Sequence, residues 1–346
     1  MKAARRNAAH VTAAFLANSG KHKSNSDVPA SALPLREANS NIAALFVGGD
    51  LVFTGSLVAL VTPFDADDRI DYAAVERLVE FHVAEGSDGL VIAGTTGESA
   101  TLERDEHAEL IGRAVEIVAG RLPVIAGTGS NSTRQTMDLS LAVGKSKIDA
   151  YLLVTPYYNK PVQEGLFRHF SAIADVVEKP VILYNVPGRT AADTLPETVG
   201  RLAKHPRIIG IKEATGDMQR LKDIKALVPE NFRLYSGDDF TAREFIDLGG
   251  HGTVTVTGNV APRLMADMCR MQAANDRDAA IALDAKLQPL NKAMFLESNP
   301  IPVKWALAEM GMISPGIRLP LTPLSDKFHG QMREAMTNAG IATGQG

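Results

Sequence analysis

Apolar and polar residues alternate in blocks from residue 51 onward, with short apolar, β-branched runs followed by segments of helical pattern. The apolar runs are continuous rather than alternating, which is typical of parallel strands covered by helices on the outside. They begin roughly 20 to 35 residues apart, the length of a strand, a loop, a helix and a second loop. The eight predicted strands are residues 57–61, 89–93, 123–126, 150–154, 180–184, 208–212, 232–236 and 252–256.

The segments between these runs show the 3.6-residue period of amphipathic helices. Asp71 is predicted to cap the first helix, which places Val75, Leu78 and Val79 on one face. Two further apolar stripes consist of Leu110, Ile111, Ala114, Val115 and Val118, and of Leu166, Phe167, Phe170, Ile173, Ala174 and Val177. After Val260 the strand signals stop, and the pattern predicts helices over residues 262–274, 276–296, 302–309 and 323–339.

Eight strand–helix units favour an α/β fold of the closed (β/α)8 TIM-barrel type. An open, doubly wound sheet is the structural alternative. The later helices are predicted to form an appendage packed on the barrel. We therefore expect the barrel over residues 51–275 and a C-terminal helical region over residues 276–346.

The first 50 residues differ from the rest of the chain. Residues 1–26 carry five Lys or Arg residues and no acid, and the following segment is rich in Ser, Asn and Ala without sustained periodicity. A secretory signal is not indicated, and an organellar transit peptide fits only weakly. We expect residues 1–50 to be a disordered leader or an overcalled N-terminus, with the native start at Val52, read as Met from a GTG codon.

Composition excludes several functional classes. The formal net charge of -4 gives no basic footprint for nucleic acid, and no apolar stretch approaches the length of a transmembrane helix. Cys269 is the single cysteine, so no intrachain disulfide is possible, and a reducing cytoplasm is the expected setting.

Lys212 stands near the end of the apolar strand predicted over residues 208–212. Burying an ammonium group costs several kcal/mol unless its charge is paired or its pKa falls. A buried lysine amine of lowered pKa is a nucleophile that forms Schiff bases with carbonyl substrates. A strand-end lysine whose stem snorkels to solvent is the ordinary alternative.

Hydroxyls and cations follow the C-terminal ends of the other predicted strands, where barrels of this type carry their chemistry. Each feature also has an ordinary explanation on its own. The segment 94–98 could be a capped strand-to-helix turn, Tyr157 and Tyr158 could be a packing pair, and Arg189 could be a solvated loop residue. Their occurrence on one rim favours an active site.

The residue types on this rim suit Schiff-base chemistry. Tyr184 is one strand before Lys212, so the two should be neighbours in a barrel, and a tyrosine can move the protons that carbinolamine formation requires. Thr95 and Tyr158 could extend the proton relay. Successive backbone N–H groups at Thr95 and Thr96 suit a substrate carboxylate. No residues have metal-ligand spacing, so we expect no metal and an iminium as the electron sink.

From about Val52 to the C-terminal region, the chain closely resembles the bacterial dihydrodipicolinate synthase family of pyruvate-dependent class I aldolases. The resemblance rests on several long motifs that occur in order. They are FTGS at 53–56, GTTGESATL at 94–102, VIAGTG at 124–129, TPYYN at 155–159, LYNVPGRT at 183–190, IGIKEATG at 209–216, SGDD at 236–239 and NPIPVKW at 299–305.

The resemblance implies roles for individual residues. Lys212 would form the Schiff base with pyruvate, without a further cofactor, and Tyr184 would donate and accept protons. Thr95 and Tyr158 match the relay, with Tyr158 reaching into a neighbouring subunit's site. Thr96 and Val254 match pyruvate-binding positions, and Arg189 matches the arginine that holds the carboxylate of L-aspartate 4-semialdehyde. Family members are mostly homotetramers built as dimers of dimers.

Relatives that use the same lysine on other substrates are the main competitors. N-acetylneuraminate lyases and keto-sugar-acid aldolases share the barrel, the lysine and the tyrosine, but generally lack the arginine motif around Arg189. A binding or regulatory protein on the same fold would be expected to lose Lys212 or the relay tyrosines, and this chain retains them.

The resemblance also points to a site at which lysine inhibits some family members. The matching positions here are Ser99, Ala100, Arg104, His107, Asn131, Gln135 and Tyr157. The feedback-sensitive pattern has histidine where Arg104 stands and glutamate where Gln135 stands. We therefore expect inhibition by L-lysine to be weak or absent.

Overall fold

The computed structural model describes residues 53–343, so the expectations for residues 1–50 lie outside the described residues. Within that range, eight parallel strands form a closed barrel in the order β1-β2-β3-β4-β5-β6-β7-β8. The strands are β1 (Gly55–Ala59), β2 (Gly89–Ile92), β3 (Val124–Gly127), β4 (Ala150–Val154), β5 (Val181–Asn185), β6 (Ile208–Glu213), β7 (Arg233–Ser236) and β8 (Gly252–Thr255).

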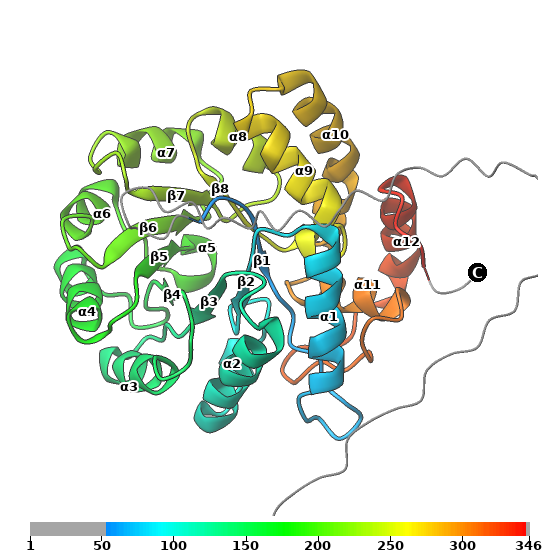
Figure 1. Cartoon of the computed structure of the whole chain (residues 1–346), viewed down its shortest axis with the longest axis horizontal. Helices are drawn as coiled ribbons and strands as arrows, with labels where there is room; N and C mark the ends of the chain where they lie inside the picture. The colour runs from blue at the N-terminus through cyan, green and yellow to red at the C-terminus, as the bar shows by residue number, and fades with distance from the viewer. Residues whose placement is uncertain (1–52, 344–346) are drawn as a thin grey trace, which may run out of the picture. The chain divides into compact units, whose positions relative to one another are not determined.

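Helices surround this barrel (Figure 1). The helices between and after the strands are α1 (Tyr72–Glu85), α2 (Arg104–Val118), α3 (Thr133–Val143), α4 (Gln163–Val176), α6 (Pro196–Leu202), α7 (Met218–Lys225), α8 (Ala242–Asp247) and α9 (Pro262–Ala273), with the short α5 (Pro187–Thr190) after β5. Three later helices follow, which are α10 (Arg277–Ala293), α11 (Ile301–Glu309) and α12 (His329–Asn338). The predicted α/β barrel with C-terminal helices is thus confirmed, whereas its division at residue 275 stays a prediction.

Two apolar layers hold the barrel together. Side chains along each strand alternate between the barrel interior and the helices outside. The inner cluster includes Phe53, Leu57, Ile125, Ile182, Tyr235 and Val254. The Tyr235 hydroxyl donates to the Phe53 carbonyl over 3.0 Å. Burial of side chains on both faces of the strands explains their continuous apolar runs.

The capping signals in the sequence coincide with helix ends in the structure. Asp71 caps α1 by accepting from the backbone N–H of Ala74, and Gly86 ends the helix with a φ of 76°. Glu103 and Glu106 form a reciprocal capping box at the start of α2.

Two predicted starts were wrong by two residues or more. The first strand begins at Gly55 rather than at residue 57, because Gly55 and Ser56 pair with Gly252 and Thr253 of β8 although neither is apolar. The last helix begins at His329 rather than at residue 323, since a 3-10 turn over Asp326–Phe328 precedes it. No helix among residues 53–343 is long and apolar enough to cross a membrane.

Candidate active site

Lys212 is a buried amine inside the barrel. It lies on β6 with 5% of its surface exposed, and its Nζ atom is 4.2 Å from the centroid of the Tyr184 ring. Within residues 53–343 it forms no ion pair, unlike the other buried lysine, Lys304, whose ammonium pairs with Glu98. Burial without an ionic partner favours a nucleophilic rather than a structural role for Lys212.

The strand register sets the contact between Lys212 and Tyr184. The two residues are directly paired across β5 and β6, as their positions on consecutive strands predicted. The Tyr184 carbonyl is fixed from the other side, because it accepts from the backbone N–H of Thr155 over 2.8 Å and from its hydroxyl over 3.1 Å. Tyr184 is 6% exposed, so its ring is held in the same interior space as the amine.

The loop after β2 carries Thr95 and Thr96. The backbone folds back on itself through a hydrogen bond from the Gly97 N–H to the Gly94 carbonyl. The Thr96 side chain is buried and its hydroxyl accepts from Asn299 Nδ2 over 3.0 Å. Among the described residues, the backbone N–H groups of Thr95 and Thr96 have no protein acceptor. Two neighbouring unpaired donors suit a carboxylate.

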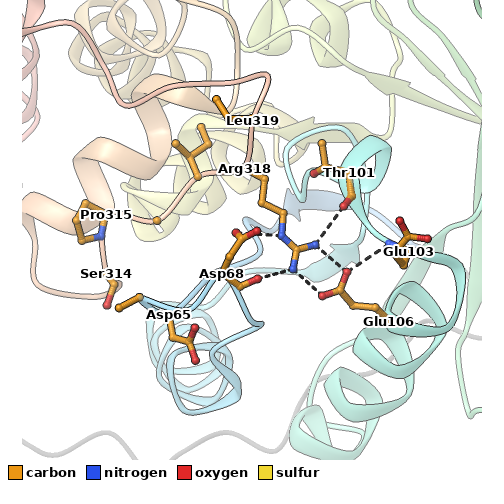
Figure 2. Close-up of a pocket in the computed structure, with 12 residues that line it drawn as sticks. Asp65, Asp68, Thr101, Glu103, Glu106, Ser314, Pro315, Arg318 and Leu319 are labelled. Atoms are coloured by element: carbon orange, nitrogen blue, oxygen red, sulfur yellow. Dashed lines mark hydrogen bonds and ion pairs between the residues drawn. The ribbon is translucent and has the colours of Figure 1, made fainter.

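The C-terminal region braces this loop from behind. The buried Glu98 carboxylate pairs with Lys304 of α11 and accepts from the backbone N–H of Arg318 over 3.1 Å. The Arg318 guanidinium donates to both oxygens of Glu106 over 2.7 Å each and to the Thr101 carbonyl over 3.1 Å. Figure 2 shows the contacts of Arg318 with Glu106 and Thr101, and these residues line an open surface cavity of about 1120 Å³. The loop after β2 is therefore held by contacts with residues of the C-terminal region.

β7 and β8 complete the wall around Lys212. Val254 lies in the barrel interior at 1% exposure. The buried Asp239 carboxylate accepts from the backbone N–H groups of Val256 and Thr257 and so fixes the end of β8. Gly237 follows β7, and a Cβ added to it would lie 2.9 Å from Lys212 Cε. Only glycine leaves this space to the lysine stem.

Arg189 lies on the short helix α5 after β5. Its side chain is exposed, and Nη2 donates to the Asn299 carbonyl over 3.2 Å. Asn299 therefore contacts both Arg189 and the buried Thr96, which come from different loops. This contact places a guanidinium on the same rim as the unpaired N–H groups of Thr95 and Thr96.

The predicted relay is not joined within one chain. Tyr158 lies on the loop after β4 with a φ of 74° and 88% of its surface exposed. Within residues 53–343, no hydrogen bond links the hydroxyls of Tyr158, Thr95 and Tyr184. A side chain this exposed is free to enter another molecule's site, and the relay through Tyr158 stays a prediction.

The predicted lysine-site positions lie on three segments: from the turn after β2 into α2, from the loop after β3 into α3, and on the loop after β4. His107 is buried, its Nε2 lies 2.8 Å from the Gly127 carbonyl, and burial lowers its pKa. Gln135 accepts from the Ser130 hydroxyl over 3.2 Å, and the Asn131 carbonyl accepts from Asn159 Nδ2 over 2.8 Å. Ser99 is partly buried, whereas Ala100, Arg104 and Tyr157 are exposed.

Sequence reasoning missed several residues around the site. Asn299, Gly237 and Asp239 lie in motifs that the sequence displays, but their contacts join segments far apart in the chain. Among residues 53–343, no three His, Cys, Asp or Glu side chains are grouped to hold a metal ion.

Comparison with known proteins relates this chain to one family of enzymes. The sequence model of the Dihydrodipicolinate synthetase family matches residues 52–339. A 4-hydroxy-tetrahydrodipicolinate synthase of Pseudomonas savastanoi pv. phaseolicola is 58% identical over 290 residues, covering 84% of this chain and 99% of the relative.

Solved structures give the same result. The chloride-inhibited dihydrodipicolinate synthase from Acinetobacter baumannii, crystallised with pyruvate, has a TM-score of 0.83 at 48% identity and covers 84% of this chain and 100% of that one. The enzyme from Cyanidioschyzon merolae with lysine bound has a TM-score of 0.82 at 38% identity, covering 84% of this chain and 99% of that one.

Proposed function

We infer that this chain, which belongs to the dihydrodipicolinate synthetase family, condenses pyruvate with L-aspartate 4-semialdehyde through a Schiff base on Lys212. The product is 4-hydroxy-tetrahydrodipicolinate, an intermediate of diaminopimelate and lysine biosynthesis. The observation that carries the role of Lys212 is its burial against Tyr184 without an ionic partner.

The reaction begins when the Lys212 amine attacks the keto carbon of pyruvate. The carbinolamine loses water to give an iminium ion, which serves as the electron sink without a metal or organic cofactor. Loss of a methyl proton then gives an enamine. Tyr184 would donate and accept these protons, and the contact of its ring with the amine supports this role. Thr95 and Tyr158 would connect it to solvent.

The pyruvate carboxylate would be bound by the loop after β2. The unpaired N–H groups of Thr95 and Thr96 and the fixed Thr96 hydroxyl support this assignment. Val254 would pack against the apolar side of the substrate from the barrel interior.

The enamine carbon would attack the aldehyde carbon of the second substrate. Arg189 would bind the carboxylate of L-aspartate 4-semialdehyde, since a guanidinium matches a carboxylate with two parallel hydrogen bonds. The amine of this substrate then attacks the imine carbon, closes the ring and releases Lys212 as a free amine. Each bond to Lys212 is thus formed and broken within one turnover.

We place the enzyme in the cytoplasm as a homotetramer built from two dimers. The 88% exposure of Tyr158 supports a shared site, in which the tyrosine of one subunit completes the relay of its partner.

Borohydride reduction in the presence of pyruvate, followed by peptide mapping, tests the Schiff base. We expect one adduct on Lys212 and none on Lys304, which is also buried but paired with Glu98. An adduct elsewhere, or none, would overturn the assignment.

The second substrate is tested with Arg189→Ala. Imine formation with pyruvate should be unchanged, whereas kcat/KM for the semialdehyde should fall about 100-fold, a typical loss when one partner of a charge pair is removed. N-acetylneuraminate and keto-sugar acids serve as competing substrates. Intact turnover of the semialdehyde by this variant would remove the main support for its binding by Arg189.

A further inference from the structure

A second pair of residues lies directly beyond the catalytic pair on the same two strands. Asn185 ends β5 and Glu213 ends β6, and they are paired in register one position after Tyr184 and Lys212. Because successive side chains alternate between the two faces of a strand, this pair points away from the barrel interior. Asn185 is 0% exposed and Glu213 is 3% exposed.

These two side chains are joined across the strands. Asn185 Nδ2 donates to Glu213 Oε2 over 3.0 Å and to Asp193 Oδ1 over 2.8 Å. The other oxygens are also used, since Asn185 Oδ1 accepts from the Thr194 N–H and Glu213 Oε1 accepts from the Thr215 N–H. The loops that follow both strands are thereby bound to the same pair.

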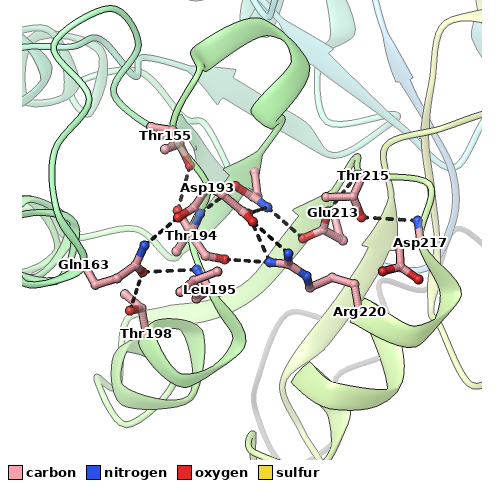
Figure 3. Close-up of polar contacts among 12 residues, drawn as sticks. Thr155, Gln163, Asp193, Thr194, Leu195, Thr198, Glu213, Thr215, Asp217 and Arg220 are labelled. Atoms are coloured by element: carbon pink, nitrogen blue, oxygen red, sulfur yellow. Dashed lines mark hydrogen bonds and ion pairs between the residues drawn. The ribbon is translucent and has the colours of Figure 1, made fainter.

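Arg220 of α7 braces the pair from outside. Its Nη1 and Nη2 donate to the two carboxylate oxygens of Asp193 over 3.0 and 2.7 Å. Figure 3 shows the Asp193 carboxylate beside the Arg220 guanidinium, with Glu213 close by. The network therefore connects β5, β6, the loop after β5 and α7.

The pairing of β5 and β6 is irregular where the strands begin. Val181 pairs with Ile208, but Ile182 pairs with Gly210, so Ile209 is an extra residue on β6. A bulge of this kind shifts the register of everything that follows. A further slip of one residue would turn Lys212 out of the barrel, because side chains alternate with a period of two. A contact that fixes the register is therefore needed at the other end of β5 and β6.

A buried carboxylate is a costly way to join two strands. Burial raises the pKa of Glu213, and a well-packed apolar pair would often be at least as stable. A polar pair differs from an apolar one in that its donors and acceptors match in one register only.

We propose that Asn185 and Glu213, braced by Asp193 and Arg220, form a register lock that positions Lys212 against Tyr184. They act through the strands and touch no substrate, so they are positioning residues. This proposal rests on the Schiff-base function of Lys212. The lock would explain why the Lys212 amine lies against the Tyr184 phenol although β6 contains an extra residue.

The test compares Glu213→Met, which removes both acceptors, with Glu213→Gln, which keeps the shape and one acceptor. The measurement is the rate of pyruvate adduct formation on Lys212 under borohydride, divided by the adduct finally formed per chain. We expect this rate to fall about 100-fold in Glu213→Met, as for a misplacement of about 1 Å, and clearly less in Glu213→Gln. The final adduct per folded chain should match the wild type.

Asp284→Asn is the matched control, because it weakens the partly buried Arg243–Asp284 pair between α8 and α10, away from Lys212. It should lower thermal stability without changing the normalised rate. A wild-type normalised rate in Glu213→Met would overturn the lock. If that variant does not fold, a wild-type normalised rate in Glu213→Gln overturns it instead. Absence of adduct in the wild type would instead contradict the proposed function.

Discussion

The Nζ atom of Lys212 and the ring of Tyr184 are in cation–π contact, 4.2 Å from nitrogen to centroid. The aromatic face attracts a cation, so the ring would stabilise the charged iminium that we propose to form at this nitrogen. The phenol hydroxyl is a separate element of the same side chain, and within residues 53–343 it donates no hydrogen bond. Packing and proton transfer by Tyr184 can therefore be separated by experiment.

Tyr184→Phe should keep the ring contact and remove the proton carrier. We expect kcat to fall by about 10²- to 10⁴-fold, the usual contribution of a general acid–base group. The melting temperature should hardly change, because no hydrogen bond within the described chain is lost. Steady-state kinetics and thermal unfolding check both statements, and a wild-type kcat would contradict the role of the hydroxyl.

Gly237→Ala should displace the lysine stem. The added Cβ would lie 2.9 Å from Lys212 Cε and 2.7 Å from Ala214 Cβ, closer than such atoms can approach. We expect slower imine formation and a loss of about 1–3 kcal/mol in unfolding free energy from overpacking. Gly330→Ala in α12 is the control, since its Cβ would meet nothing within 4 Å. Equal behaviour of the two variants would argue against a crowded site.

Hybrid oligomers test whether Tyr158 acts in a partner's site. Tyr158→Phe and Lys212→Met should each be nearly inactive alone. In a hybrid dimer with a shared site, one site carries both changes and the other carries neither. Co-expressed hybrids, separated by affinity tags, should then be more active than either parent. Activity no higher than that of the parents would place both residues in the site of a single chain.

Inhibition by L-lysine should be weak or absent. Gln135 offers no negative charge to a ligand ammonium, and the exposed Arg104 adds a like charge at the start of α2. The double change Arg104→His with Gln135→Glu should introduce inhibition, measured as the lysine concentration that halves the initial rate. Half-maximal inhibition of the unchanged enzyme at submillimolar lysine would refute this expectation.

Buried histidines should make the fold sensitive to acid. His82 is 0% exposed, and burial lowers its pKa to about 3, whereas an unfolded histidine titrates near 6.5. Between these values the unfolded state binds a proton that the folded state does not. The unfolding free energy should therefore fall by about 1.4 kcal/mol per pH unit below about pH 6 from this residue.

Urea unfolding at several pH values measures how the unfolding free energy depends on pH. In His82→Gln this slope should decrease by the amount that corresponds to about one bound proton. His169, whose pKa burial lowers to about 4, should behave in the same direction. An unchanged slope in His82→Gln would show that this imidazole does not titrate between the two states.

The sequence was most informative where the signal was local. Strands buried on both faces leave continuous apolar runs, so all eight could be located, and consecutive strands of a barrel are neighbours, so Tyr184 could be placed beside Lys212. The start of β1 was missed because Ser56 is buried by pairing with β8 rather than by being apolar.

Contacts between distant segments left no such signal. The pairing of Glu98 with Lys304 joins residues 206 positions apart, and neither residue is unusual in its own surroundings. The lock between Asn185 and Glu213 was also missed, because an extra residue in β6 is visible only when the strands are paired. The periodicity of apolar residues, 2 in strands and 3.6 in helices, carries no information about either feature.

The ties of Glu98 to Lys304 and Arg318 also bear on how the enzyme is made. The loop that presents Thr95 and Thr96 is synthesised early, but the arginine that supports it is 220 positions later than Glu98. Until Arg318 has been synthesised, the nascent barrel contains Lys212 without this support for the loop of Thr95 and Thr96. Competence for the proposed reaction should therefore arise only after Arg318 has been synthesised and has docked against Glu98.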